Sequence, residues 1–259
     1  MSRVALTIFN INIYWYSLFI LLGVLIAYFL IIRESIKHNI DKNQMLDIIF
    51  YTLIIGIIGA RIYYVIFNLD YYLSYPLEII KIYNGGLAIH GGVISGTIFL
   101  YFYTKRKQLD YLKILDICAP GLIIAQAIGR WGNFFNKEAY GSIVSLNQLN
   151  KMHIPSFIIN EMYIDGKYHY PTFFFESILC IFGFIIIMII RKNRNIKVGM
   201  QSGTYLLWYG IIRFFIEQLR TDSLMLFNIK VAQLVSIFGI ILGIFLIITS
   251  RKRKNYYKE

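Results

Sequence analysis

The chain has 259 residues, of which 58% are hydrophobic and only 15% are charged, and it carries a formal net charge of +12. Soluble domains hold about a quarter charged residues, so this composition excludes an ordinary soluble domain and favours a polytopic membrane protein. The positive charge does not indicate nucleic-acid binding, because the cations form short clusters between apolar runs. Such clusters are typical of loops that anchor to anionic lipid headgroups.

Seven apolar runs are long enough to cross a bilayer as helices. They cover residues of about 13–32, 47–67, 87–104, 114–135, 171–190, 203–219 and 231–249. No small-residue cleavage site follows the first run, so we interpret it as a helix rather than a signal peptide. The fourth run contains Pro120 and several glycines, which predicts a kink or a break. We therefore predict an all-α polytopic protein.

The runs follow one another without a linker that would separate domains. We expect a single integral membrane domain over residues 1–259, with a small extracytoplasmic element at about 136–170. Sixteen lysines and arginines follow the first, third, fifth and seventh runs, and seven lie on the other side. Because cytoplasmic loops carry the excess of these cations, we expect the N-terminus outside and the C-terminus in the cytoplasm.

Three arginines lie inside the predicted spans, where a charge is costly unless it has a partner or a function. In the expected orientation all three fall in the outer half of the bilayer: Arg61, Arg130 and Arg213. Further polar side chains lie near the outer starts of other spans: Tyr16, His90 and Glu176. Snorkelling of Arg61 alone remains an alternative. The whole set instead predicts an outer-leaflet pocket for an anion, and guanidinium groups suit the phosphate of a lipid headgroup.

The run "GRWGNFFNKEAYG", residues 129–141, concentrates several of these features. Arg130 and Asn133 are three residues apart and share a helix face. Gly129 and Gly132 flatten the surface beside them, so a headgroup or a facing helix can approach closely. Glu138 follows at the expected helix exit. A glycine-rich helix contact with an interfacial arginine is the alternative interpretation.

A second polar stripe follows one face of the sixth span. Its members are spaced four, four and three residues apart, as Tyr209, Arg213, Glu217 and Arg220. An internal ion-pair ladder is the alternative here. In "GGLAIHGG", residues 85–92, His90 lies between glycines. An imidazole there can accept a proton, although a packed structural histidine remains the alternative.

Two further stretches are "GARI" at 59–62 and "RFFIEQLR" at 213–220. Together, the four stretches resemble motifs of the prolipoprotein diacylglyceryl transferase family. They occur in the same order as in that family, and the resemblance covers nearly the whole chain. The resemblance implies a seven-helix enzyme of the bacterial cytoplasmic (inner) membrane. Such enzymes transfer the diacylglyceryl group of phosphatidylglycerol to a cysteine thiol of a preprolipoprotein and release glycerol phosphate. The positions that match functional residues of the family are Tyr16, His90, Arg130, Asn133, Glu138, Gly141, Tyr209, Arg213 and Glu217. This chain has Tyr170-Pro171 where members often have His-Pro, with His169 adjacent.

The resemblance leads to a mechanistic hypothesis. His90 takes the proton of the substrate cysteine, and Arg130 and Arg213 hold the departing phosphate at an active site that faces the outer leaflet. Arg61, Asn133, Tyr16, Tyr209, Glu138, Gly141 and Glu217 are expected to contribute to phosphatidylglycerol binding. Neither Cys118 nor Cys180 is needed, and no metal or cofactor is expected.

The expected partners are phosphatidylglycerol, the lipobox of a preprolipoprotein signal peptide and membrane lipids, with no nucleic acid. A transporter for an organic anion or lipid headgroup is the alternative function, although it predicts polar residues in the inner halves of the spans, and several of these are apolar. A retinal photoreceptor is excluded because the last run contains no lysine.

Overall fold

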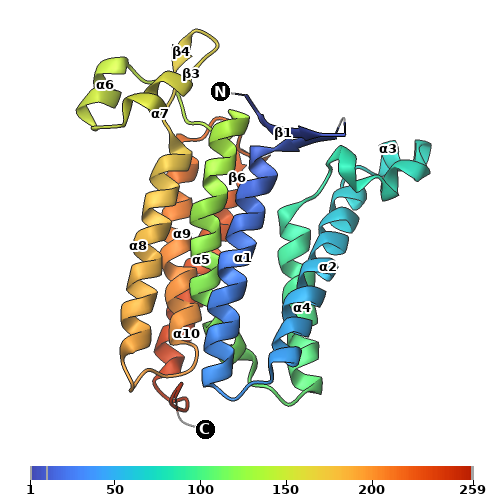
Figure 1. The fold of residues 1–259 in the computed structure, drawn as a ribbon, viewed down its shortest axis with the longest axis vertical. Coiled ribbons are helices and arrows are strands. Elements are labelled where there is room, and N and C mark those ends of the chain that lie inside the picture. Colours follow the sequence, from blue (N-terminus) through green and yellow to red (C-terminus); the bar gives the residue numbers. More distant parts are fainter. Residues whose placement is uncertain (1, 10, 258–259) are drawn as a thin grey trace. The chain divides into compact units, whose positions relative to one another are not determined.

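A computed structural model describes residues 2–9 and 11–257. Within these residues, seven helices have 18 residues or more, and each begins and ends within five residues of a predicted span. They are α1 (Trp15–Lys37), α2 (Lys42–Ile66), α4 (Ile89–Arg106), α5 (Tyr111–Asn136), α8 (Thr172–Lys192), α9 (Met200–Leu219) and α10 (Val231–Ser250) (Figure 1). The predicted all-α polytopic fold is confirmed.

Five of these helices are both long enough and apolar enough to span a membrane: α1, α2, α5, α8 and α10. Helices α4 and α9 have comparable lengths, but polar and charged side chains lower their hydropathy. Seven spans and the orientation of the termini therefore stay predictions.

The chain forms two compact units. The first contains the chain up to Ile31 and from Leu115 onward, and the second is Ile32–Ile114. The prediction of one integral membrane domain is not tested by this division, and each unit is described by itself.

The second unit consists of α2 packed against α4, with a connection made of α3 (Leu69–Ser74) and the 3-10 turns η1 (Pro76–Ile80) and η2 (Ile82–Asn84). Small residues let the two long helices approach closely. A Cβ on Gly91 would lie 2.4 Å from the carbonyl oxygen of Gly59. Ser95 also donates a hydrogen bond of 3.0 Å to the carbonyl of Ile55. The glycines that follow His90, Gly91 and Gly92, thus serve a helix contact within this unit.

In the first unit, α9 packs against both α8 and α10, and small residues again form the contacts. A Cβ on Gly203 would lie 3.0 Å from the carbonyl oxygen of Gly243. Helix α1 approaches α5 in the same way, because a Cβ on Gly23 would lie 3.1 Å from the carbonyl oxygen of Ala125. Figure 1 shows these five helices as one bundle.

The sequence predicted a kink or a break at Pro120; helix α5 continues through it, so the break is wrong and the kink stays a prediction. A proline has no N–H, which leaves the carbonyl four residues earlier without its helical donor. That carbonyl belongs to Asp116, and Arg191 Nη2 on α8 donates to it at 2.7 Å. Arg191 also donates to the side chain of Gln201 at 2.5 Å. A neighbouring helix therefore satisfies the group that the proline leaves free.

The side chain of Asp116 caps α9 from α5. It accepts hydrogen bonds from the backbone N–H groups of Gly199, at 2.6 Å, and Ser202, at 2.7 Å. Gly199, at the N-cap position of α9, has no side chain to do so and has a φ of 92°. This acid therefore has a structural role at the end of the bundle opposite the expected pocket.

Shorter elements lie outside the long helices. Strands β1 (Val4–Ile8) and β2 (Ile11–Tyr14) form an antiparallel hairpin that the hydropathy pattern did not predict. The small element predicted at 136–170 contains α6 (Leu146–Lys151), α7 (Ser156–Glu161), β3 (Tyr163–Ile164) and β4 (Lys167–Tyr168). Its Leu149 and Ile158 share one apolar core with Phe134 of α5 and Phe173 of α8. A third hairpin, β5 (Met225–Leu226) and β6 (Ile229–Lys230), precedes α10.

Candidate active site

Polar side chains from four helices gather at one end of the first unit. The chain enters α1 and α8 at the end where it leaves α5 and α9 (Figure 1). Tyr16 and Glu176 lie in the first two turns of α1 and α8, and Arg130 and Arg213 lie in the last two turns of α5 and α9. The sequence placed these residues at one depth, and within this unit their helices bring them to the same end.

A chain of ion pairs crosses from α5 to α9 through α8. Arg130 Nη2 lies 2.6 Å from Glu176 Oε1, and Arg213 Nη1 lies 3.6 Å from Glu176 Oε2. Arg213 Nη2 lies 2.6 Å from Glu217 Oε2 on its own helix. Both glutamate side chains are 2% exposed, whereas the two arginines keep nearly a fifth of their side-chain surface exposed. The carboxylates thus hold the guanidinium groups from the buried side.

Neighbouring hydrogen bonds extend this network. The hydroxyl of Tyr209 donates to Glu176 at 3.3 Å and accepts from Arg130 Nη2 at 3.2 Å. Arg130 Nη1 lies 3.5 Å from the amide oxygen of Asn133. The amide nitrogen of Asn133 donates to Glu138 at 2.9 Å. Glu138 therefore reaches Arg130 through Asn133, in a relay of two hydrogen bonds.

Arg213 retains an unused donor. Its Nη1 is buried and makes no hydrogen bond with any described residue. Its nearby carboxylate oxygen is Glu176 Oε2, at the ion-pair distance of 3.6 Å. The exposed parts of the Arg130 and Arg213 side chains, nearly a fifth of each, are open to a ligand with acceptor oxygens.

Arg220 ends the polar stripe on α9. Its Nε lies 3.9 Å from Glu217, and it donates two hydrogen bonds to Asp222 at 2.9 and 2.7 Å. Burial raises the pKa of Asp222, but the hydrogen bonds and positive charge of Arg220 outweigh burial, and the net effect lowers that pKa. The ion-pair ladder considered from the sequence therefore exists, and it leaves Arg130 and Arg213 facing the candidate site.

Gly141 lies where the small element meets α9. It forms a β-bridge with Arg220, and its N–H donates to the carbonyl of Tyr170 at 2.9 Å. A Cβ on Gly141 would lie 2.7 Å from the Cβ of Tyr170. His169 Nδ1 lies 2.8 Å from the carbonyl oxygen of Gly141. A close approach between backbones thus explains the glycine, and His169 helps to hold this turn.

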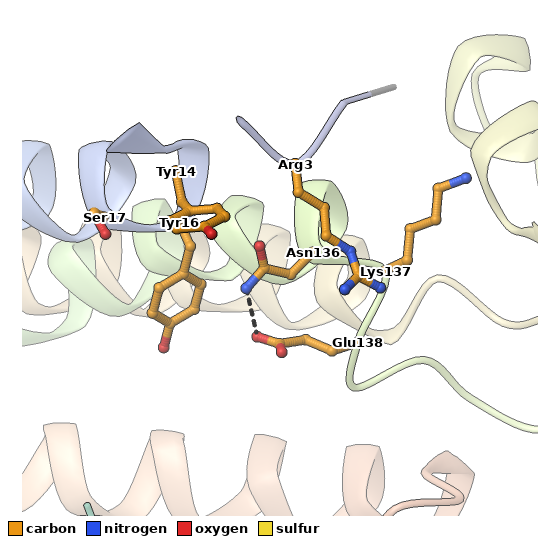
Figure 2. Close-up of a pocket in the computed structure, with 7 residues that line it drawn as sticks. All are labelled: Arg3, Tyr14, Tyr16, Ser17, Asn136, Lys137 and Glu138. Carbon is orange, nitrogen blue, oxygen red and sulfur yellow. Dashed lines mark hydrogen bonds between the residues drawn. The ribbon is translucent and has the colours of Figure 1, made fainter. Parts of the chain in front are cut away.

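A cavity of about 360 Å³ opens beside this network (Figure 2). Its lining residues are Arg3, Tyr14, Tyr16, Ser17, Asn136, Lys137 and Glu138. Asn136 donates to Glu138 at 3.4 Å, the contact drawn in Figure 2. Tyr16 packs over Gly132, where a Cβ would lie 2.8 Å from its ring. The cavity therefore connects the start of α1 with the Glu138–Asn133 relay.

Two predicted site residues, His90 and Arg61, belong to the second unit. His90 is the second residue of α4 and is half-buried. The centroid of its ring lies 6.4 Å from the centroid of the Tyr63 ring. Arg61 is buried and donates to four backbone carbonyls of its own unit. That geometry favours a structural role for Arg61 over the headgroup contact predicted from the sequence.

The sequence interpretation counted Glu176 among the polar side chains of the pocket but did not predict its partners. Its signal was an acidic residue in an otherwise apolar run. The structure gives it contacts to two arginines from two other helices.

Similarity to known proteins identifies the family of this chain. The family model described as "Prolipoprotein diacylglyceryl transferase" matches residues 3–249. A protein of Staphylococcus aureus strain MSSA476, named phosphatidylglycerol–prolipoprotein diacylglyceryl transferase, is 51% identical over 97% of this chain and 90% of its own length. A protein of the same name from strain Newman is 50% identical over the same shares. This chain therefore belongs to the prolipoprotein diacylglyceryl transferase family.

Proposed function

We propose that this chain transfers the diacylglyceryl group of phosphatidylglycerol to the thiol of a lipobox cysteine in a preprolipoprotein. The reaction releases glycerol phosphate and is the first step of bacterial lipoprotein maturation. Support comes from family membership and from the names of the Staphylococcus aureus relatives, which specify phosphatidylglycerol and prolipoprotein.

The observation that carries the proposal is that one buried carboxylate, Glu176, holds Arg130 and Arg213 from two other helices, and each arginine keeps nearly a fifth of its side-chain surface exposed. The exposed guanidinium donors could bind phosphate oxygens. When the carbon–oxygen bond to phosphate breaks, negative charge develops on the leaving glycerol phosphate. Arg130 and Arg213 would stabilise that charge in surroundings where water screens it poorly.

The neighbouring residues set the positions of these two arginines. Glu176 holds both guanidinium groups, and Glu217 holds Arg213 from its own helix. Tyr209 and Asn133 contact Arg130 and can also reach a bound headgroup. Tyr16 and Glu138 line the adjacent cavity, where the glycerol part of the headgroup can lie. Gly141 supports the turn beside Arg220.

The nucleophile belongs to the peptide substrate. A thiol with a pKa of about 8.5 must lose its proton before it attacks efficiently. We assign this proton to His90, directly or through water. The thiolate sulfur then bonds to the glycerol carbon as that carbon's bond to the phosphate oxygen breaks, so the products are a thioether and glycerol phosphate. Cys180 is fully buried in α8 and takes no part.

We place this chemistry at the outer leaflet of a bacterial cytoplasmic membrane. The excess of lysine and arginine after alternate spans supports a cytoplasmic C-terminus. In that orientation, the arginine-rich end of the first unit faces outward, where exported preprolipoproteins and outer-leaflet phosphatidylglycerol are both accessible.

The test supplies purified protein with phosphatidylglycerol and a synthetic lipobox peptide. We expect the peptide to gain the mass of one diacylglyceryl group at its cysteine, with one equivalent of glycerol phosphate released. A peptide with the cysteine replaced by serine is the control and should gain no mass. Absence of the thioether, together with movement of phosphatidylglycerol across vesicle bilayers, would instead support the transporter alternative.

A further inference from the structure

Arg61, on α2 of the second unit, anchors the segment that leads to His90. Its Nε donates to the carbonyl of Ile79 at 2.8 Å, and its Nη2 donates to that of Glu78 at 2.5 Å. Its Nη1 donates to the carbonyls of Gly85 and Gly86 at 2.8 and 2.9 Å. One guanidinium group therefore connects the end of η1 to the turn that precedes α4.

This arrangement employs nearly all the N–H donors of Arg61. The residue is 7% exposed, and its guanidinium carbon lies 5.1 Å from the centroid of the Tyr72 ring. No ion pair with a carboxylate occurs for Arg61 in residues 2–9 and 11–257. Backbone carbonyls and an aromatic face thus compensate the buried charge. Few donors remain with which Arg61 could bind a phosphate bidentately.

The anchored turn is short and runs directly into α4. Gly85 and Gly86 both have positive φ angles, of 86° and 74°. Two residues later, the N–H of Ala88 donates to the carbonyl of Ala60 at 3.0 Å. His90 follows in the first turn of α4.

Contacts with α2 therefore hold the chain on both sides of His90. The Arg61 hydrogen bonds lie before it, and the close contact of Gly91 with Gly59 follows it. Loss of the Arg61 contacts would leave the Ala88–Ala60 hydrogen bond as a remaining contact with α2 before His90.

We infer that Arg61 is a positioning residue for His90: its hydrogen bonds to the Gly85 and Gly86 carbonyls fix the first turn of α4 and so the place of the imidazole. This role rests on the proposed function of His90 as the proton acceptor. It replaces a headgroup contact for Arg61 and makes different kinetic predictions. A positioning residue changes kcat through His90, whereas a headgroup ligand changes KM for phosphatidylglycerol.

Two variants disturb this contact by different means. Arg61→Lys keeps the charge but cannot reach four carbonyls, because an ammonium lacks the planar fork. Gly86→Ala keeps Arg61 but places a Cβ 2.4 Å from its Nη1. Gly56→Ala is the matched control on the α2–α4 contact, because its Cβ would meet only the Gly92 carbonyl oxygen, at an ordinary 3.6 Å.

The experiment measures kcat and KM for phosphatidylglycerol in these variants, alone and combined with His90→Gln. We expect kcat to fall about 100-fold in Arg61→Lys and Gly86→Ala, because a displacement of the His90 imidazole by about 1 Å has an effect of that size. KM should change less than about threefold. In the His90→Gln background, Arg61→Lys should cause little further loss. Gly56→Ala should behave as the parent.

A second measurement needs no activity. Diethylpyrocarbonate labels accessible histidines, and peptide mass spectrometry compares its rate at His90 with that at His169 in the same sample. We expect the labelling rate of His90 to change at least about threefold in Arg61→Lys and Gly86→Ala, because the first turn of α4 shifts in both. The rate should not change in Gly56→Ala. Full activity of His90→Gln would contradict the proton role while leaving this labelling result to be judged separately. The positioning role would be overturned if the labelling rate of His90 stayed unchanged in Arg61→Lys and Gly86→Ala. It would also be overturned if the losses of kcat caused by Arg61→Lys and His90→Gln multiplied in the double variant.

Discussion

Glu176 Oε1 on α8 lies 2.6 Å from Arg130 Nη2 on α5, in an ion pair whose carboxylate also faces a second arginine. Glu176 Oε2 lies 3.6 Å from Arg213 Nη1 on α9. One carboxylate thus sets the spacing of two guanidinium groups from two helices. The glutamate side chain is 2% exposed, whereas the two arginines keep nearly a fifth of their side-chain surface exposed.

We predict that Glu176→Gln lowers both stability and activity. The amide cannot neutralise two arginines, and breaking a fully buried pair costs about 3–5 kcal/mol. We expect a smaller loss in the free energy of unfolding, about 2 kcal/mol, because Arg130 and Arg213 retain some contact with solvent. Transfer of diacylglyceryl should fall at least about 100-fold, since the arginines lose their relative positions.

Glu161→Gln provides the control for this prediction. Glu161 pairs with Lys137 at 3.2 Å in the small element, where both side chains are more exposed. Such pairs contribute about 0–1 kcal/mol. Thermal unfolding in detergent and the peptide mass assay should separate the two variants. Equal melting temperatures and rates in Glu176→Gln and the parent would refute a bridging role for Glu176.

A second prediction concerns the chemistry of the guanidinium group at position 130. Arg130→Lys should lose activity at least about 100-fold despite keeping its charge, because an ammonium cannot contact Glu176, Tyr209 and a phosphate in one plane. Arg194→Lys, at an exposed position after α8, is the matched control and should retain the parent rate. The measurement is kcat/KM for phosphatidylglycerol, and near-parental activity of Arg130→Lys would argue against phosphate binding there.

Much of the first unit's candidate site was predictable, because its signals lie within single helices. Arg130 and Asn133 are three residues apart, and Arg213 and Glu217 are four apart, so each pair had to share a helix face. The lengths of the apolar runs likewise located every long helix to within five residues. Such features depend on local sequence and need no knowledge of packing.

Other features depend on tertiary contacts and could not be predicted. Arg191 was counted among the cytoplasmic cations, yet it is 6% exposed and bonded to the Asp116 carbonyl. Arg61 was placed in the headgroup pocket because a lone arginine in a span does not reveal its acceptors, which lie 17–25 residues further along the chain. The strands of residues 4–14 are too short for a clear alternating pattern.

A third prediction compares two glycines of α5. Gly132→Ala should reduce activity about tenfold, because its Cβ would lie 2.8 Å from the ring of Tyr16 and displace that side chain from the cavity. Gly129→Ala meets only Ile20, at an ordinary 3.4 Å. It should keep the parent rate and gain up to about 1 kcal/mol of helix stability. Rates and melting temperatures measured together test this contrast, and equal loss of activity in both variants would contradict it.

The last prediction tests how the protein accommodates Pro120. Arg191→Met should destabilise the protein by about 1.5–3 kcal/mol, because the Asp116 carbonyl loses a charged donor. Lys192→Met, at the exposed neighbouring position, should have little effect on stability. In a Pro120→Ala background, a backbone N–H at position 120 can donate to the Asp116 carbonyl as in an ordinary helix.

In the Pro120→Ala background, Arg191→Met should therefore lower the free energy of unfolding by about 1 kcal/mol less than it does in the parent. The difference is the coupling between position 120 and Arg191, which share the Asp116 carbonyl as acceptor. Part of the loss should persist, because Arg191 also donates to Gln201. Denaturation of all four members of the cycle in the same detergent measures the coupling. Strictly additive losses would mean that the helix tolerates the unpaired carbonyl without Arg191, and that Arg191 stabilises the bundle through other contacts, such as its hydrogen bond to Gln201 on α9.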